Sequence, residues 1–429
     1  MNQTRSSGLG EAMPAVPNDV HLSHKSRQTL VVVGAGLGMG GGFAALYFST
    51  MALFLKPIAT EFGWGRAQTS AATMLAMVGM AVGAMVVGRF IDRFGAPRMI
   101  ALSAFAMSVL TASLSLLPGS PAVMGTLCFL IGLVGVATTP LGYLSVLPRW
   151  FDARLGFALG AAMVGLGLGT IVFPVMAQKW ILALGWRDAY VALAATSLVI
   201  SMVAWGMVFS MRAPTVETAV SRLRGQDDAA EGVTLRQAVR SARYWLIAVV
   251  LFVASAAGLG VAVHGAALLT DRGLSPEGAA QVAALSGLGV MLGRLAAGAL
   301  MDAMSAPPVG AASFLLGATG IAIYAYGPAG HLAILGLAGV LAGFAIGAEG
   351  DLIPFAVRRY FGTRAFSAIY GTLFGVYALG GVVGPVVFGI AFDRTGGYRG
   401  ILTAAAIGCV LAAIGSLGFG PDRYRHTKH

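Results

Sequence analysis

Charged residues are scarce in this 429-residue sequence and make up only 10% of it. Ordinary soluble domains carry roughly 25% charged residues. Here 57% of the residues are hydrophobic and the mean hydropathy is +0.81. These values exclude a disordered chain and argue strongly against a soluble protein, because so apolar a surface needs a solvent other than water. They favour a protein that lies in a lipid bilayer.

Cysteine and histidine are also scarce, with two and six residues. Cys128 and Cys409 both lie in apolar runs, so we expect two buried free thiols rather than a disulfide or a metal site. The six histidines are scattered along the chain, and the sequence has no H-E-x-x-H, G-x-S-x-G or Walker A motif. We therefore expect no enzyme, no cofactor, no metal and no nucleotide-driven pump.

Long polar stretches are rare beyond residue 29. Residues 1–29 contain no apolar core, so we expect no cleavable signal peptide. Twelve continuous apolar runs follow, each about 18 to 28 residues long and able to cross a hydrocarbon core of about 30 Å. The runs are 30–55, 67–87, 99–117, 122–147, 155–177, 189–211, 244–269, 278–301, 309–326, 332–357, 365–392 and 401–419. Strands of a membrane barrel would be about 10 residues long and would alternate in polarity. The runs therefore predict an all-α polytopic membrane protein.

The basic residues predict its orientation. With the N-terminus inside, 20 of the 28 lysines and arginines fall in inside segments, seven fall in outside segments, and Arg294 lies within a span. Positive charge gathers on the cytoplasmic side of membrane proteins, so both termini are predicted to be cytoplasmic. The cytoplasmic bias of the basic residues accounts for the net charge of +11. We therefore expect no nucleic acid as a partner. The predicted location is the bacterial inner membrane.

A single long polar linker divides the spans six and six. The predicted domains are a tail at 1–29, a six-helix half at 30–211, a cytoplasmic linker at 212–243, a second six-helix half at 244–420 and a tail at 421–429. Thr234 and Gln237 have the spacing of a capping box. The residues that would then share one helical face are Leu235, Val239, Ala242 and Leu246. We expect a short helix on the inner membrane surface, with the linker as a tether; regulation is the alternative.

The two halves repeat each other in sequence. Gly88 and Asp92 match Gly298 and Asp302 at an offset of 210 residues. At the same offset, the residues Arg149, Phe151, Arg154, Ala158 and Gly165 match Arg359, Phe361, Arg364, Ala368 and Gly375. Such a repeat predicts two pseudo-symmetric six-helix bundles about an axis along the membrane normal, with the substrate between them.

Residues 88–98, GRFIDRFGAPR, resemble the loop 2–3 signature of the major facilitator superfamily, G-x-x-x-D-R-x-G-x-R, with one residue inserted before the last arginine. The resemblance implies the major facilitator fold and a secondary active transporter that works by alternating access. It also implies that Asp92 engages helix ends and gates the inner mouth. We call such a contact between an aspartate and helix ends a latch. The second copy keeps Asp302 but has Ala303 where the first copy has Arg93, so we expect the second latch to be degenerate. The predicted gating residues are Gly88, Arg89, Asp92, Arg93, Gly95, Arg98, Arg149, Arg154, Asp302, Arg359 and Arg364.

Four further segments resemble the monocarboxylate-transporter-like branch. Residues 149–154, RWFDAR, with Ala158 and Gly160 after them, resemble its helix 4–5 signature, and residues 54–57 and 61–64 resemble bacterial members. Gly293-Arg294-x-x-x-Gly298 matches the place where that branch and its oxalate-transporting relatives keep a carboxylate-binding arginine. The resemblance implies a monomeric symporter of a small organic anion and a proton. A proton-coupled efflux antiporter for drugs or metabolites is the alternative, and a scaffold or sensor is a third class.

Arg294 is the sharpest candidate for substrate binding. It lies 16 residues into its span from Gly278, or about 24 Å at 1.5 Å per residue. An unpaired charge at that depth costs several kcal/mol, so the side chain needs a wet cavity or an acidic partner. Its planar fork matches a carboxylate. A buried ion pair that only locks the halves together is the alternative.

Glu349 and Asp351 are the candidates for proton coupling, because a carboxyl group within a span can bind and release a proton. Two residues apart on a helix, their side chains diverge by about 200°, so only one can face a given point. A structural pair with Arg294 or Arg358 is the alternative. The remaining candidates for lining the substrate path are Tyr47, Thr139, Tyr143, His264 and Tyr377, each with packing as its alternative role.

The sequence departs from the family pattern at three places. Animal monocarboxylate transporters carry a lysine where Ser49 stands and an aspartate where Val290 stands, so their proton relay does not transfer. Oxalate-type relatives keep a lysine in helix 11, and residues 365–392 contain none. A clamp of arginine plus lysine for a dianion is therefore doubtful, which favours a monoanion as the substrate.

Overall fold

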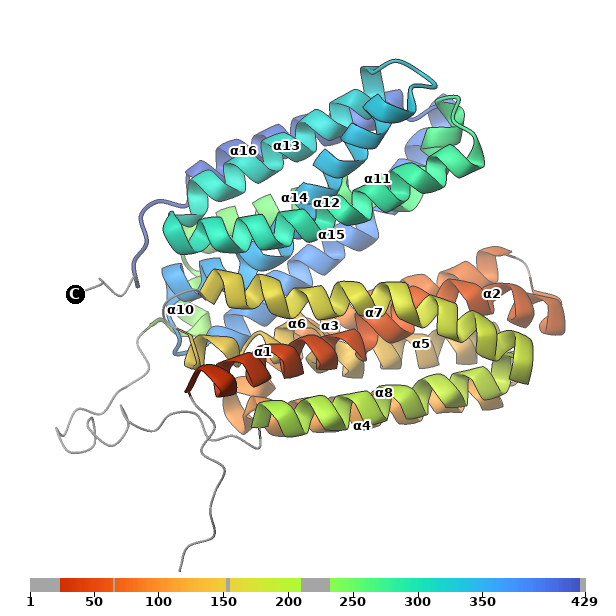
Figure 1. The fold of residues 1–429 in the computed structure, drawn as a ribbon, viewed down its shortest axis with the longest axis horizontal. Helices are drawn as coiled ribbons and strands as arrows, with labels where there is room; N and C mark the ends of the chain where they lie inside the picture. Colours follow the sequence, from red (N-terminus) through yellow and green to blue (C-terminus); the bar gives the residue numbers. More distant parts are fainter. Residues whose placement is uncertain (1–23, 65, 152–154, 210–231, 425–429) are drawn as a thin grey trace, which may run out of the picture.

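The computed structural model describes residues 24–64, 66–151, 155–209 and 232–424. Among them are twelve helices that are long and apolar enough to cross a membrane, which confirms the predicted number of spans. Figure 1 shows them as two bundles, one from each half of the sequence. The predictions for residues 1–23, 210–231 and 425–429 lie outside the described residues.

The N-terminal half contains eight α-helices, because two of its six spans are interrupted. They are α1 (His24–Gly40), α2 (Ser49–Phe62), α3 (Arg66–Phe94), α4 (Ala96–Ser113), α5 (Pro121–Gly135), α6 (Pro140–Tyr143), α7 (Leu155–Leu184) and α8 (Trp186–Phe209). Between them lie a π-helical segment η1 (Phe43–Phe48) and the 3-10 turns η2 (Leu114–Leu116), η3 (Val136–Thr138) and η4 (Leu147–Arg149).

The C-terminal half is more regular, with one continuous helix for each span. The short helix α10 (Leu235–Val239) precedes it. The six spans are α11 (Ala242–Asp271), α12 (Pro276–Ala303), α13 (Ala306–Tyr326), α14 (Leu332–Phe361), α15 (Phe366–Thr395) and α16 (Arg399–Leu417). The helices α7 and α15 occupy equivalent places in the two halves and are both 30 residues long, in agreement with the sequence repeat.

Spans 1 and 4 are interrupted, whereas the sequence predicted continuous helices over 30–55 and 122–147. Glycines follow α1, and Pro140 begins α6 after an extended Thr139. Proline lacks the N–H that a helix interior needs, and threonine hydroxyls compete for backbone groups. The Thr138 hydroxyl accepts a hydrogen bond of 3.0 Å from the N–H of Phe43, so the two interruptions meet.

The linker helix is shorter than the sequence predicted. The capping box of Thr234 and Gln237 is present, but α10 ends at Val239. Ser241 then caps a new helix, α11, so Ala242 does not share a helix face with Leu235. The linker is fastened to the end of α14, because the Val233 N–H donates to the Phe361 carbonyl at 2.9 Å.

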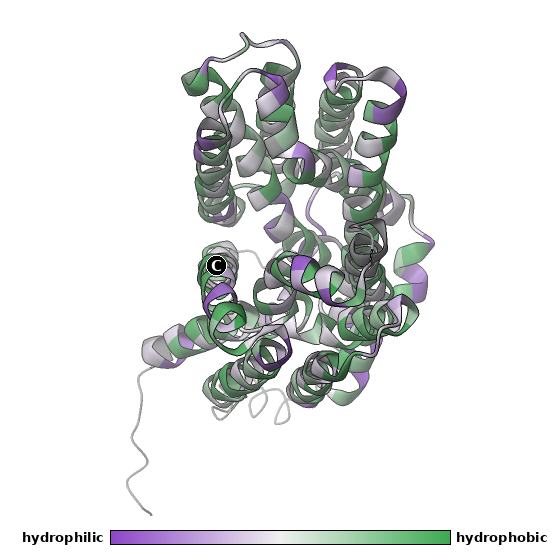
Figure 2. Cartoon of the chain, turned by 90° about the vertical axis from the view of Figure 1, so that its right-hand side faces the viewer, coloured by the Kyte–Doolittle hydropathy of each residue, from purple (hydrophilic) through white to green (hydrophobic). Residues whose placement is uncertain are grey.

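The outer surface of the bundles is apolar over much of its area. Leu182 and Ile171 on α7 are exposed by 78% and 68%, and large apolar side chains on most other spans are exposed as well. Figure 2 shows hydrophobic colouring along most of the helices. This surface fits contact with lipid chains. Cys128 and Cys409 are free and buried, as predicted.

Candidate functional site between the two halves

Arg294 on α12 faces Asp351 on α14, both in the C-terminal half. Their closest charged atoms, Nη1 and Oδ1, are 3.8 Å apart, and the side chains are exposed by 16% and 0%. Neither Arg294 Nη1 nor either Asp351 oxygen has a hydrogen-bond partner among the described residues. At this distance the contact is an attraction between charges without a hydrogen bond. The pair therefore retains donor and acceptor capacity for a ligand.

This ion pair lies where the two halves touch. A Cβ on Gly160 of α7 would be 2.9 Å from the Arg294 carbonyl oxygen and 3.7 Å from Asp351 Oδ2. A Cβ on Gly350 would be 3.3 Å from Arg294 Nη1 and 3.8 Å from the methyl carbon of Met163 on α7. Small residues at both places let helices of opposite halves approach closely. A charge here can respond to movement between the halves.

Two tyrosines on α15 are near the ion pair. Tyr370 is fully buried, its hydroxyl has no partner among the described residues, and it interacts electrostatically with both Arg294 and Asp351. Tyr377 interacts with Arg294 and Glu349 and stacks on Phe374 with ring centroids 5.7 Å apart. Tyr377 was predicted from the sequence as a residue of the substrate path, and Tyr370 was not. Their spacing of seven residues, which puts both on one helix face, could have revealed it.

Glu349 points away from Asp351, into the C-terminal half. Its side chain lies in a small space among α12, α13 and α14, with Met301 and Ser313 at its walls. It is 3% exposed, and Oε1 has no hydrogen-bond partner among the described residues. The structure thus brings Asp351, rather than Glu349, into contact with Arg294.

The other proposed path-lining residues make contacts within their own halves. Tyr47 donates to Cys128 Sγ at 3.2 Å, and Thr139 donates to the Val136 carbonyl and caps α6. Tyr143 is buried against α1, where a Cβ on Gly38 would lie 2.3 Å from its hydroxyl. His264 contacts Tyr398 Oη and the Pro385 carbonyl, each at 3.0 Å. The contacts of Tyr47, Thr139 and His264 favour the packing role, whereas the buried Tyr143 hydroxyl has no hydrogen-bond partner among the described residues.

Two aspartates join the halves at the end of the bundle that carries the linker. Asp92 of α3 accepts hydrogen bonds from the N–H groups of Ser367 and Ala368 at 3.0 and 2.7 Å. Asp302 of α12 accepts from Gly156 and Phe157 at 2.6 and 2.9 Å. Each carboxylate caps the first turn of a 30-residue helix in the opposite half, where the helix dipole favours negative charge.

The second latch is complete, although its loop has Ala303 in place of an arginine. The sequence predicted a degenerate latch there, but Asp302 makes the same pair of bonds as Asp92. The reason is that the backbone N–H groups of α7 supply the donors, so the arginine is not needed for this contact.

The other residues predicted to take part in gating have different surroundings. A Cβ on Gly88 would lie 2.1 Å from the Ser367 carbonyl oxygen, so only glycine fits there, and Gly95 has a φ of +87° at the turn into α4.

Among the arginines, Arg93 lies over the Phe94 ring, 5.2 Å from its centroid. Arg359 pairs with Asp422 within its own half. The arginines that are simply exposed at this end are Arg89, Arg98 and Arg364. Arg154 and the side chain of Arg149 lie outside the described residues.

Arg358 is a contact between the halves that the sequence analysis did not assign to gating. Its Nη1 donates to the Phe151 carbonyl oxygen at 2.8 Å. The bonds of Arg358, Asp92 and Asp302 all lie at the end where Figure 1 shows the bundles close together, and the bundles diverge towards the other end.

Comparison with known proteins agrees with this architecture. The family model "Major Facilitator Superfamily" matches residues 37–350. Monocarboxylate transporter 13 of Bos taurus is 26% identical over 378 residues, which are 86% of this chain and 82% of that protein. The gallate transporter of Pseudomonas putida is 24% identical over 403 residues, covering 87% and 88%. The crystal structure of the E. coli transporter FucP in the outward conformation matches 93% of this chain and 99% of its own, with a TM-score of 0.69 and 13% identity.

Proposed function

The chain belongs to the Major Facilitator Superfamily, a family of transporters rather than enzymes, and on that premise we propose that it carries a small monocarboxylate together with a proton. Arg294 binds the carboxylate of the substrate and Asp351 takes the proton. The observation that carries the proposal is the ion pair of Arg294 and Asp351 at the contact between the halves. Its closest charged atoms are 3.8 Å apart, and they have no hydrogen-bond partner among the described residues.

The charge balance of the pair links the anion to the proton. A guanidinium within the membrane needs a negative partner, and Asp351 supplies one when no substrate is bound. An incoming carboxylate supplies the same charge and can bind the planar fork through two hydrogen bonds. If Asp351 then takes up a proton, the site again holds one positive and one negative charge. Substrate and proton therefore favour each other's binding.

The two latches provide the conformational part of the cycle. With Asp92 and Asp302 bonded to helices of the opposite half, the linker end of the bundle is closed. Release of these bonds opens that end, and closure of the other end completes alternating access. We place the linker and both termini in the cytoplasm of a bacterial cell, so the closed end faces inward.

The relatives support a carboxylate as the substrate. The names of the bovine monocarboxylate transporter and the P. putida gallate transporter both denote carboxylates, and each aligns with more than four fifths of this chain. Within α15, which lies beside the ion pair, no lysine is available to pair with a second carboxylate. We therefore expect a monoanion.

Uptake into proteoliposomes tests the proposal. Purified protein is reconstituted, and accumulation of labelled lactate, benzoate and gallate is measured with the outside at pH 6 and the inside at pH 7.5. We expect uptake of at least one of these monoanions, dependent on the pH gradient. Arg294→Gln and Arg294→Lys should each reduce it to background, because neither side chain can bind a carboxylate through the same fork.

The matched control is Arg272→Gln, which removes a positive charge just after the end of α11. The Arg272 side chain donates a hydrogen bond to a carbonyl group near the end of α13, away from the Arg294–Asp351 pair. This variant should retain most of the uptake. Uptake by Arg294→Gln at the level of the control would contradict the proposal. Gradient-driven export of cationic compounds, with no uptake of the monoanions, would favour the efflux antiporter.

A further inference from the structure

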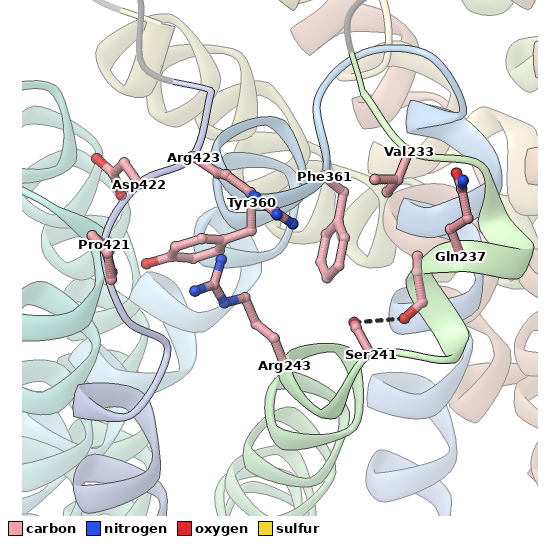
Figure 3. A pocket seen from close by; sticks show the side chains of 10 residues that line it. Val233, Gln237, Ser241, Arg243, Tyr360, Phe361, Pro421, Asp422 and Arg423 are labelled. Carbon is pink, nitrogen blue, oxygen red and sulfur yellow. Dashed lines mark hydrogen bonds between the residues drawn. The ribbon is translucent and has the colours of Figure 1, made fainter.

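We propose that a pocket at the linker end of the C-terminal half binds a phosphate group. The pocket, here called the linker–tail pocket, has a volume of about 610 Å³. Its walls include Gln237 and Ser241 before α11, Arg243 at the start of α11, Tyr360 at the end of α14, and Asp422 and Arg423 near the C-terminus (Figure 3). It is separate from the Arg294–Asp351 pair.

Two arginines give the pocket a positive charge. The Arg243 guanidinium lies 5.0 Å from the centroid of the Tyr360 ring, and Arg423 lies beside the same ring in Figure 3. The acidic side chain of the pocket, Asp422, is already paired with Arg359. The charges of Arg243 and Arg423 are therefore left to attract an anion. Planar guanidinium groups bind phosphate oxygens through paired hydrogen bonds.

Backbone hydrogen bonds and packing place both arginine residues at the pocket. The N–H groups of Arg423 and Tyr424 both donate to the Arg359 carbonyl at 3.0 Å. The Tyr360 hydroxyl donates to the Gly420 carbonyl at 3.3 Å. Gly420 has a φ of +76°, which favours glycine, and a Cβ there would lie 2.9 Å from Arg243 Nη2, so the arginine packs closely against this turn. The packing of Arg243 against Tyr360 restricts its side chain before any ligand binds, which lowers the entropy that binding costs.

The start of α11 adds to the attraction. Ser241 caps this 30-residue helix, and Arg243 is its second residue. The N-terminus of a helix carries a partial positive charge and favours anions. The dipole and the two side chains thus act on the same pocket.

The ligand can come from a phospholipid headgroup or from a soluble phosphate ester, and the position favours the headgroup. Trp245, two residues after Arg243, is 57% exposed, and its indole N–H donates to the Val239 carbonyl. Exposed tryptophans gather at the level of lipid headgroups. Basic pockets beside spans on the cytoplasmic side bind anionic lipids.

Binding to the purified, full-length protein in detergent tests the proposal. Phosphatidylglycerol, phosphatidylcholine and soluble glycerol 3-phosphate are titrated separately, and bound ligand is counted by native mass spectrometry. The double variant Arg243→Gln, Arg423→Gln removes both pocket charges. The matched control is Arg236→Gln, Arg240→Gln, which removes two exposed charges of the linker that do not line the pocket. Arg243→Lys, Arg423→Lys keeps the charges and guards against loss of folding.

We expect phosphatidylglycerol to bind at least tenfold more tightly than phosphatidylcholine, and the glutamine pocket variant to lose this preference. The control should keep it, and the lysine variant should keep part of it. Binding of glycerol 3-phosphate that depends on the same arginines would support the site and identify a soluble ester as its ligand. Equal loss in the pocket variant and the control, or no loss in either, would overturn the proposal.

Discussion

Arg294 is a positive charge that the protein keeps within a membrane span, and its neighbours show how that charge is tolerated. Asp351 lies at 3.8 Å without a hydrogen bond, and Tyr370 and Tyr377 interact with the guanidinium from α15. A pair built only for stability would satisfy its donors and acceptors, because unsatisfied buried polar groups are costly. The unsatisfied atoms here therefore fit a site that is completed by a ligand.

The two buried carboxyl groups are expected to behave differently when neutralised. Asp351→Asn removes the proton carrier beside Arg294, so we expect loss of uptake driven by the pH gradient, with exchange of internal for external substrate retained. Glu349→Gln changes a side chain that faces α13, and we expect it to keep at least half of the gradient-driven uptake. Both transport modes are measured in proteoliposomes. The reverse pattern would move proton coupling to Glu349.

At the scale of elements, the latches are the contacts most open to a direct test. Asparagine in place of Asp92 and Asp302 keeps one acceptor oxygen but loses the charge that faces each helix N-terminus. Each lost bond contributes about 0.5–1.5 kcal/mol, so each latch shifts the balance towards the open inner end by up to about tenfold. Cytoplasmic labelling of Met163→Cys by a thiol reagent, with Cys128 and Cys409 changed to serine, should therefore become faster.

The control for this experiment is the double variant Asp271→Asn, Asp393→Asn. It removes two exposed acidic charges near the C-terminal ends of α11 and α15, at the end of the molecule away from the latches. Its labelling rate should stay near that of the parent. If the latch variant also labelled at the parent rate, Asp92 and Asp302 would not hold the inner end closed.

The sequence predicted the elements well where the signal is long or repeated. The twelve spans follow from continuous apolar runs, and the offset of 210 residues matched Asp92 with Asp302, which make equivalent contacts. The interruptions at η1 and Pro140 were missed, because an apolar run has the same composition whether its helix is continuous or broken.

The candidate site was predicted only in part. Arg294 stood out as a charge within a span, and the spacing of Glu349 and Asp351 showed that their side chains diverge. Helical spacing gives the angle between two side chains, but not which of them faces a third residue on another helix. Packing of α12 against α14 decides this in favour of Asp351. Arg358 was missed because its acceptor is a backbone carbonyl, which has no signature in the sequence.

At the scale of the whole molecule, one monoanion carried with one proton moves no net charge. A membrane potential of 100 mV would otherwise change accumulation roughly 50-fold for each charge moved, at about 2.3 kcal/mol per charge. We therefore expect potassium diffusion potentials, set with valinomycin, to change uptake by less than about twofold at a fixed pH gradient. Uptake driven by the potential alone would show that more than one proton, or another cation, accompanies the anion.

The interruptions of spans 1 and 4 lead us to expect that the N-terminal half bends more easily than the C-terminal half. A span made of two helical segments can bend at the break while its ends stay anchored. The hydrogen bond from Phe43 to Thr138 joins the breaks of spans 1 and 4. We expect this bond to couple a movement of α2 relative to α1 to α5 and α6. In the half that holds Arg294 and Asp351, the corresponding spans are the continuous helices α11 and α14. We therefore expect the proposed substrate site in the C-terminal half to keep its shape while the N-terminal half bends around it.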